Sequence, residues 1–164
     1  MLALRRSELV GVDVTHLDDR SDGLVVTIPK SKTDQDGGGR KIGIPYGSNP
    51  STCPVRAVRA WLDRSGIEEG PVFRPVRHGK VLDTRLTGRS VALIVKRVGK
   101  ASGLDPVGLA GHSLRAGLVT SAAAAGVSER AIMNQTGHRS LPTLRRYIRD
   151  GSLFRENAAA AVGL

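Results

Sequence analysis

The first third of the chain alternates apolar and polar residues over short runs, which is the pattern of β-strands with one buried face. Such runs span 12–18, 23–28 and 41–45, and the second of them is rich in β-branched residues. Asp22-Gly23, between the first two runs, has the composition of a hairpin turn. The pattern therefore predicts a small antiparallel sheet of three strands.

The spacing of apolar residues elsewhere is that of α-helices. Residues 1–9 have the pattern of a helix end that Gly11 stops. Pro54 suits the first turn of a helix that Ser65-Gly66 closes, with Ser51 or Thr52 as its cap. Trp61 falls on the apolar side of this helix and is predicted to lie in the core.

Later segments follow the same helical spacing, apart from one irregular stretch. Residues 70–88 are rich in Gly, Pro and Arg and predict a loop in which His78 is exposed. Further helices are predicted over 89–101, from His112 onward, from Ser128 to the residues before Gly137, and from Ser140 and Pro142 through Tyr147. An apolar stripe over 153–164 predicts a terminal helix that docks on its own domain or on a neighbouring protomer. The predicted fold class is α+β, mainly helical with a small three-stranded antiparallel sheet.

The charge of the chain indicates an anionic partner. Lys plus Arg number 25 and Asp plus Glu 15 among 164 residues, a formal net charge of +10. Nucleic acid is favoured over a membrane surface because no long apolar run and no Lys-rich amphipathic helix is evident. Aromatic residues make up only 3% of the chain, so contacts with backbone phosphates are expected rather than base stacking.

The cysteine content and the N-terminus indicate a reducing compartment. The single cysteine, Cys53, cannot form an internal disulfide, and the N-terminus lacks the apolar core of a signal peptide. Cys53 is predicted to be a small buried residue, since no His stands beside it in the sequence. No metal-ligand cluster and no phosphate-binding G-x-x-x-x-G-K motif occurs, so no cofactor is predicted.

Candidate chemistry lies between 111 and 147. His112 and Arg115 are three residues apart and would share one face of a helix. Gly137 stands where a C-cap glycine is expected, which places His138 just outside a helix end. Tyr147 falls inside the next predicted helix. Groups arranged in this way can converge on one anion, and a tyrosine among them is a candidate nucleophile.

These residues resemble the C-terminal signature of the tyrosine recombinases, also called the phage integrase family. The likeness rests on H-x-x-R at 112–115, Gly-His at 137–138 and Tyr147. Leu-Arg-Arg-Ser-Glu-Leu at 4–9 is similar to the first-arginine motif of that family, with Arg5 in the catalytic place. Ser-Lys-Thr at 31–33 is similar to its catalytic-lysine turn, with Lys30 as a rival to Lys32. The likeness covers nearly the whole chain.

The resemblance implies a fold, a domain assignment and a set of partners. Residues 1–164 would form a tyrosine recombinase catalytic domain that lacks the N-terminal core-binding domain and the first part of the catalytic domain. The chain would thus be a fragment or a truncated reading frame. Its partners would be double-stranded DNA and other recombinase protomers, assembled as a tetramer on DNA. It would act in the cytoplasm, at the nucleoid.

The resemblance also implies a reaction, namely metal-independent cleavage and rejoining of DNA through a 3′-phosphotyrosine intermediate. Tyr147 would attack the phosphorus, Arg5 and Arg115 would grip its nonbridging oxygens, and His112 would act as the base. His138 would hydrogen-bond the phosphate, and Lys32 would protonate the leaving oxygen. The implied catalytic set is Arg5, Lys32, His112, Arg115, His138 and Tyr147.

Several interpretations of the basic residues and of the function stay open. In the family the 89–101 helix approaches the DNA groove, so Lys96, Arg97 and Lys100 are candidate DNA contacts, and a plain solvated face is about as plausible. Arg6 is interpreted as a solvated helix charge. Loop residues that could touch phosphates are Arg74, Arg77, Lys80 and Arg85. The alternative functions are a type IB topoisomerase, which typically carries Lys where His112 stands, and a non-catalytic DNA-binding remnant.

Overall fold

The computed structural model describes residues 4–29, 39–138 and 140–152. A short helix, α1 (Arg6–Val10), leads into a three-stranded antiparallel sheet. The strands β1 (Leu17–Arg20), β2 (Gly23–Ile28) and β3 (Arg40–Pro45) lie in the order β1-β2-β3, with Val26 opposite both Leu17 and Ile42. The predicted sheet is confirmed.

The predicted start of the first strand is wrong. Val14–His16 forms a 3₁₀ turn, η1, in which the Asp13 backbone N–H donates to His16 Nδ1 at 3.0 Å. The apolar Val12 is buried by pairing with the segment after α2 instead, because its carbonyl accepts from the Val72 backbone N–H at 3.1 Å. The alternating residues 12–18 therefore do not form one strand. Val12 pairs with the segment after α2, and residues 17 and 18 pair with β2.

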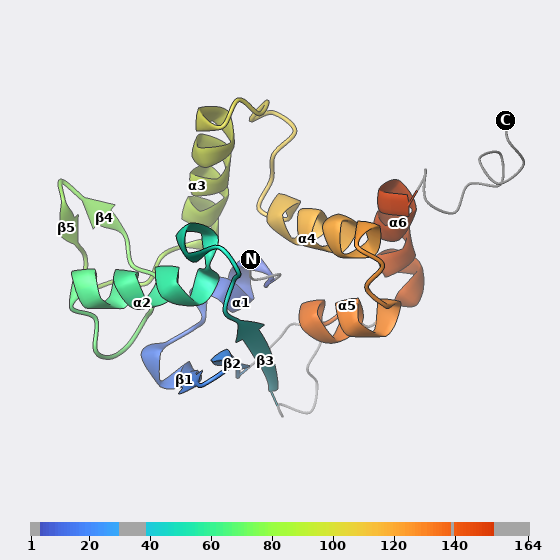
Figure 1. Cartoon of the computed structure of the whole chain (residues 1–164). Coiled ribbons are helices and arrows are strands. Elements are labelled where there is room, and N and C mark those ends of the chain that lie inside the picture. The colour runs from blue at the N-terminus through green and yellow to red at the C-terminus, as the bar shows by residue number, and fades with distance from the viewer. Residues whose placement is uncertain (1–3, 30–38, 139, 153–164) are drawn as a thin grey trace, which may run out of the picture.

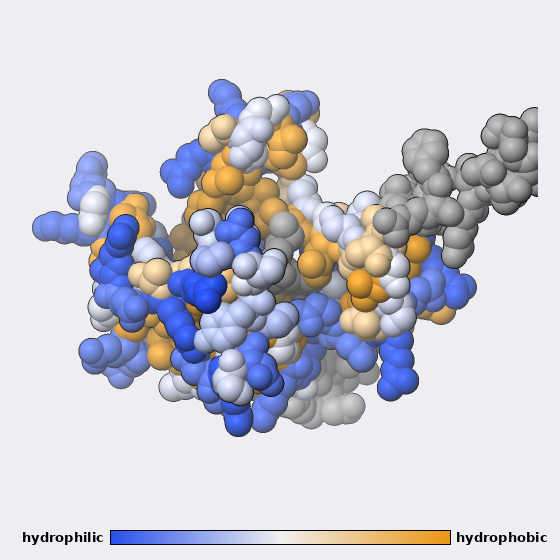
Figure 2. Space-filling view, viewed as in Figure 1, coloured by the Kyte–Doolittle hydropathy of each residue, from blue (hydrophilic) through white to orange (hydrophobic). Residues whose placement is uncertain are grey.

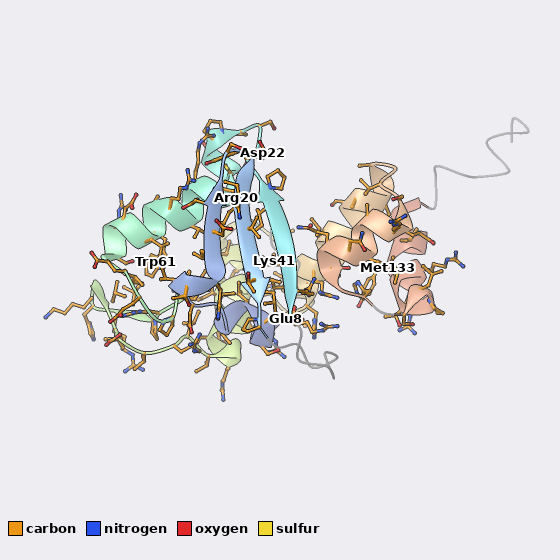
Figure 3. The ribbon with its side chains drawn as sticks, turned by 90° about the horizontal axis from the view of Figure 1, so that it is seen from below. Glu8, Arg20, Asp22, Lys41, Trp61 and Met133 are labelled. Atoms are coloured by element: carbon orange, nitrogen blue, oxygen red, sulfur yellow. The ribbon has the colours of Figure 1, made fainter. Side chains whose placement is uncertain are left out.

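Helix α2 (Pro54–Ser65) covers the apolar face of the sheet, where Val55 joins the strand residues in one buried cluster. Trp61, predicted to lie in the core, is half-buried and packs against this cluster (Figure 3), and its Nε1 donates to the Val72 carbonyl at 2.7 Å. Gly66 ends the helix in the left-handed conformation. The predicted cap is wrong, because Ser51 and Thr52 belong to a 3₁₀ turn, η2 (Pro50–Thr52), and the buried Cys53 holds the N-cap position.

The stretch after α2 is not wholly irregular. It contains a hairpin of two short strands, β4 (Val76–Arg77) and β5 (Lys80–Val81), and the exposed His78 lies in the turn between them. Helix α3 (Gly88–Ala101) follows, with the Thr87 hydroxyl capping it through the Ser90 backbone N–H. Val91 of α3 is buried, whereas Leu93, Ile94 and Val98 are exposed. Figure 2 shows apolar residues on the surface of this helix.

Three helices form the C-terminal part: α4 (Ser113–Ala124), α5 (Glu129–Thr136) and α6 (Leu141–Ser152). They pack around a second buried cluster of Val119, Ile132 and Leu144, on the β3 side of the sheet (Figure 1). No helix among the described residues is long and apolar enough to span a membrane. The predicted terminal helix at 153–164 lies outside the described residues.

Candidate active site

One pocket of about 200 Å³ gathers most of the predicted catalytic residues. Its lining consists of Arg5, His112, Arg115, Ala116, His138 and Tyr147. The structure thus brings together five of the six predicted residues from four separate elements. The sixth, Lys32, and its rival Lys30 lie outside the described residues.

Arg5 reaches the pocket from the N-cap of α1 and is held there by Glu8. Glu8 accepts from the Arg5 backbone N–H at 2.8 Å and from Arg5 Nη1 at 2.5 Å. Burial alone would raise the pKa of Glu8, but the hydrogen bonds and charge of Arg5, together with the charge of Arg40, lower it below its ordinary value. Glu8 is therefore buried and ionised, and it holds the Arg5 side chain in place (Figure 3).

Arg115 lies in the first turn of α4, and His112 occupies the N-cap of that helix, so the predicted shared face is confirmed. Arg115 is 7% exposed and its Nη1 donates to the Thr136 carbonyl at 2.6 Å. Burial, followed by the like charges of Arg5 and Arg40, lowers the pKa of Arg115 to about 10. The guanidinium stays protonated at neutral pH, in a place where a further negative charge would be favourable.

His138 follows Gly137, which ends α5 in the left-handed conformation, as predicted. The Thr136 hydroxyl donates to the Ile132 carbonyl at 2.6 Å and lies 2.7 Å from His138 Nδ1. A hydroxyl has one proton, so it accepts from Nδ1–H, and Nε2 is unprotonated in the neutral ring. Burial, then the charges of Arg115, Arg5 and Arg40, lower the pKa of His138 to about 4.

Tyr147 projects from α6 beside this histidine. The centroids of the two rings are 6.2 Å apart and the ring planes are inclined at 45°. Leu144, one turn earlier on the same helix, is fully buried against α4 and α5. The packing of α6 therefore fixes the direction in which the phenol points.

Arg40, the first residue of β3, was missed by sequence reasoning. Its Nη2 donates to Glu8 Oε2 at 3.3 Å and to the Thr136 carbonyl at 3.4 Å, and its Nη1 donates to the Gln135 carbonyl at 3.5 Å. It thus stands behind the pocket, between Glu8 and the end of α5. No local motif marks it, because its partners on α5 lie 95 and 96 residues further along the chain.

The predicted DNA contacts on α3 lie apart from the pocket. Lys96 is half-buried and Lys100 exposed, while Arg97 lines a separate groove between α3 and the β4–β5 segment. Two of the loop cations that were predicted to contact phosphates form ion pairs within the protein. Arg74 pairs with Asp83, and Arg85 pairs with Asp13. Their contact with DNA stays a prediction.

Arg6 departs from its predicted solvated role. Its side chain is half-buried and runs over Gly111, where a Cβ would collide with it. Arg6 also lines a neighbouring pocket of about 490 Å³ that shares Arg5 and His112 with the candidate active site. Within the described residues, no three His, Cys, Asp or Glu side chains cluster as metal ligands do.

Comparison with known proteins places these features in a family context. The phage integrase family matches residues 2–152. An integrase/recombinase XerD homologue of Selenomonas ruminantium is 44% identical over 157 residues, which cover 95% of this chain and 46% of that protein. Tyrosine recombinase XerC of Corynebacterium glutamicum is 31% identical over 148 residues, covering 88% of this chain and 42% of that protein. The chain spans less than half the length of either relative.

Solved structures share the fold. The XerH site-specific recombinase, in a post-cleavage complex with its palindromic difH substrate, superposes with a TM-score of 0.73 at 18% identity, over 99% of this chain and 43% of that one. The XerA recombinase gives a TM-score of 0.66 at 20% identity, over 99% of this chain and 51% of that one. The predicted tyrosine recombinase catalytic fold is confirmed. Because the family match extends almost from end to end, the chain belongs to the phage integrase family.

Proposed function

We propose that residues 1–164 form the catalytic domain of a site-specific DNA recombinase, which cuts and rejoins strands through a 3′-phosphotyrosine intermediate. The observation that carries the proposal is the convergence of two guanidinium groups, two imidazoles and one phenol on a single pocket. The names of both relatives, and the substrate-bound state of XerH, support it. Its partners would be duplex DNA and further protomers, in a tetramer on DNA at the nucleoid.

The pocket suits a phosphodiester because its arginines are anchored by the protein. Arg5 is held by Glu8, and Arg115 by the Thr136 carbonyl, so both forks are oriented before substrate arrives. Phosphoryl transfer depends mainly on positioning and on stabilising charge around the phosphorus. Two guanidinium groups that meet the nonbridging oxygens would supply that stabilisation.

The proposed reaction is a nucleophilic displacement at phosphorus. The Tyr147 oxygen forms a bond to phosphorus while the bond to the 5′ oxygen breaks. The phenolic proton passes to His112, and the leaving 5′ oxygen takes a proton from Lys32. A 5′ hydroxyl then reverses these steps on the phosphotyrosine and releases Tyr147.

His138 would meet the phosphate as a cation. Its Nδ1–H is engaged by Thr136, so only a protonated Nε2 can donate to a phosphate oxygen. The low pKa of His138 reflects burial and three neighbouring arginines in the absence of an anion. A bound phosphodiester reverses part of that repulsion, so we expect the ring to take up a proton when the phosphate binds.

A trapping experiment tests the proposal. Random-sequence duplexes with a sulfur in place of one bridging 5′ oxygen release a thiol that re-ligates poorly, so any phosphotyrosine accumulates and survives denaturing electrophoresis. We expect an adduct that mass spectrometry maps to Tyr147, that is lost in Tyr147→Phe and that is kept in Tyr46→Phe. The absence of an adduct in the wild type, or its persistence in Tyr147→Phe, would overturn the proposal.

A further inference from the structure

We propose that Arg40 is a positioning residue that holds the turn after α5, and with it His138, in place against Arg5 and Arg115. This inference rests on the proposed function. Arg40 does not line the candidate active site, so any influence on the reaction passes through the groups it binds.

The first argument is the set of acceptors that Arg40 joins. Its guanidinium donates to Glu8, which also holds Arg5, and to the Thr136 carbonyl, which also holds Arg115. One side chain from the sheet thereby connects the anchors of both pocket arginines. Because a guanidinium is a planar fork with five N–H donors on three nitrogens, it can serve all these acceptors from one place, whereas the single nitrogen of an ammonium would serve only some of them.

The second argument is the end of α5 itself. The backbone carbonyls of 135, 136 and 137 accept from Arg40, Arg115 and Arg5, which come from three different parts of the chain. The last carbonyls of a helix have no partner within the helix and carry partial negative charge. The end of α5 is therefore the common acceptor around which the cations are arranged.

The third argument is steric. The Arg40 guanidinium lies against Gly137, where an added Cβ would stand 2.7 Å from its Cζ. Gly137 has a φ of 67°, and His138 is the next residue. The packing of Arg40 on this turn thus limits where the imidazole can lie.

The test compares Arg40→Met and Arg40→Lys with Arg20→Met in the full chain. Arg20 is a matched control, because it also carries an ion pair on the sheet, with Asp18, but is 64% exposed and lies outside the pocket lining. Nitrogen-15 spectra of the histidines at neutral pH report which ring nitrogen of His138 is protonated. His138→Gln assigns its signal.

We expect the wild type, Arg20→Met and, in large part, Arg40→Lys to show His138 protonated on Nδ1. Arg40→Met should show a mixture of the two tautomers, because the turn no longer holds the ring against Thr136. In the adduct assay, Arg40→Met should react about 10- to 100-fold more slowly than Arg20→Met at similar DNA affinity, as expected for a small misplacement of catalytic groups. Arg40→Lys should recover part of that rate.

An unchanged His138 tautomer in Arg40→Met, at the adduct rate of Arg20→Met, would make Arg40 a structural ion pair and overturn the inference. If Arg40→Met does not fold, the same comparison is made with Arg40→Lys. An adduct rate and a His138 spectrum both identical to those of the wild type would then overturn the inference. If the wild type forms no adduct, the proposed function fails, and the tautomer spectra alone decide the role of Arg40.

Discussion

Replacing Glu8 by Gln should destabilise the chain strongly although it removes only one charge. The Glu8 side chain is 1% exposed, and it faces Arg5 and Arg40, whose side chains are 23% exposed. Breaking a buried ion pair costs about 3–5 kcal/mol because the partner is left uncompensated. Since these partners keep some contact with water, we expect a loss of about 2–4 kcal/mol, a fall in Tm of roughly 5–15 °C for a chain of this size.

The pH dependence sharpens this prediction. The pKa of Glu8 is lowered in the folded state, because its hydrogen bonds with Arg5 outweigh the effect of burial. A lowered carboxyl pKa contributes stability that is present above the ordinary value of 4.5 and is lost as the pH falls through the folded pKa. The difference in stability between the wild type and Glu8→Gln should therefore be largest at neutral pH and should shrink below about pH 4.5.

Urea unfolding followed by circular dichroism, at pH 7 and at steps down to pH 3.5, measures both effects. Asp19→Asn is the matched control, because Asp19 pairs with Arg59 while their side chains are 61% and 42% exposed. An exposed pair of this kind contributes little to stability, because water screens it. A Glu8→Gln loss no greater than that of Asp19→Asn, or a difference that grows as the pH falls, would refute the reasoning.

Two further predictions concern stability elsewhere in the site. The pKa of His138 is about 4 in the folded state and 6.5 ordinarily, so the unfolded chain binds more protons between these pH values. The wild type should therefore lose stability as the pH falls from 6.5 towards 4, and His138→Gln should lose less. Urea midpoints at pH 7 and pH 5 measure the difference. Leu144→Ala empties a fully buried position beneath Tyr147 and should cost about 2–5 kcal/mol in urea unfolding. Leu93→Ala, at a side chain that is 58% exposed, should cost far less, and equal losses would contradict the assigned packing.

The parts of the site that sequence predicted are those set by local chemistry. Gly137 ends α5 because a left-handed C-cap favours glycine, and that alone places His138 outside the helix. His112 and Arg115 share a face because of helix periodicity. Each depends on neighbours a few residues away, so a motif can record it.

What sequence did not predict depends on contacts between distant segments. Arg40 meets α5 only after the sheet and the C-terminal helices have docked, and Val12 is buried by a segment some sixty residues later. The apolar residues of α3 follow a helical period, but period alone does not say whether another element covers them. Long-range partners of this kind leave no trace in local spacing.

The candidate active site is lined by residues from both parts of the chain, the part that contains the first hydrophobic cluster and the part that contains the second. Arg5 and Glu8 belong to the sheet side, whereas Arg115, His138 and Tyr147 belong to the α4–α6 side. Hydrogen bonds join the two sides. They include those from Arg5 and Arg40 to the end of α5 and the one from Gln135 to the Gly43 carbonyl. If the two halves part while each keeps its own core, Tyr147 separates from Arg5. Under the proposed function, a nascent or damaged molecule in that state would not cut DNA, because the proposed cleavage needs Tyr147 and both arginines in one pocket.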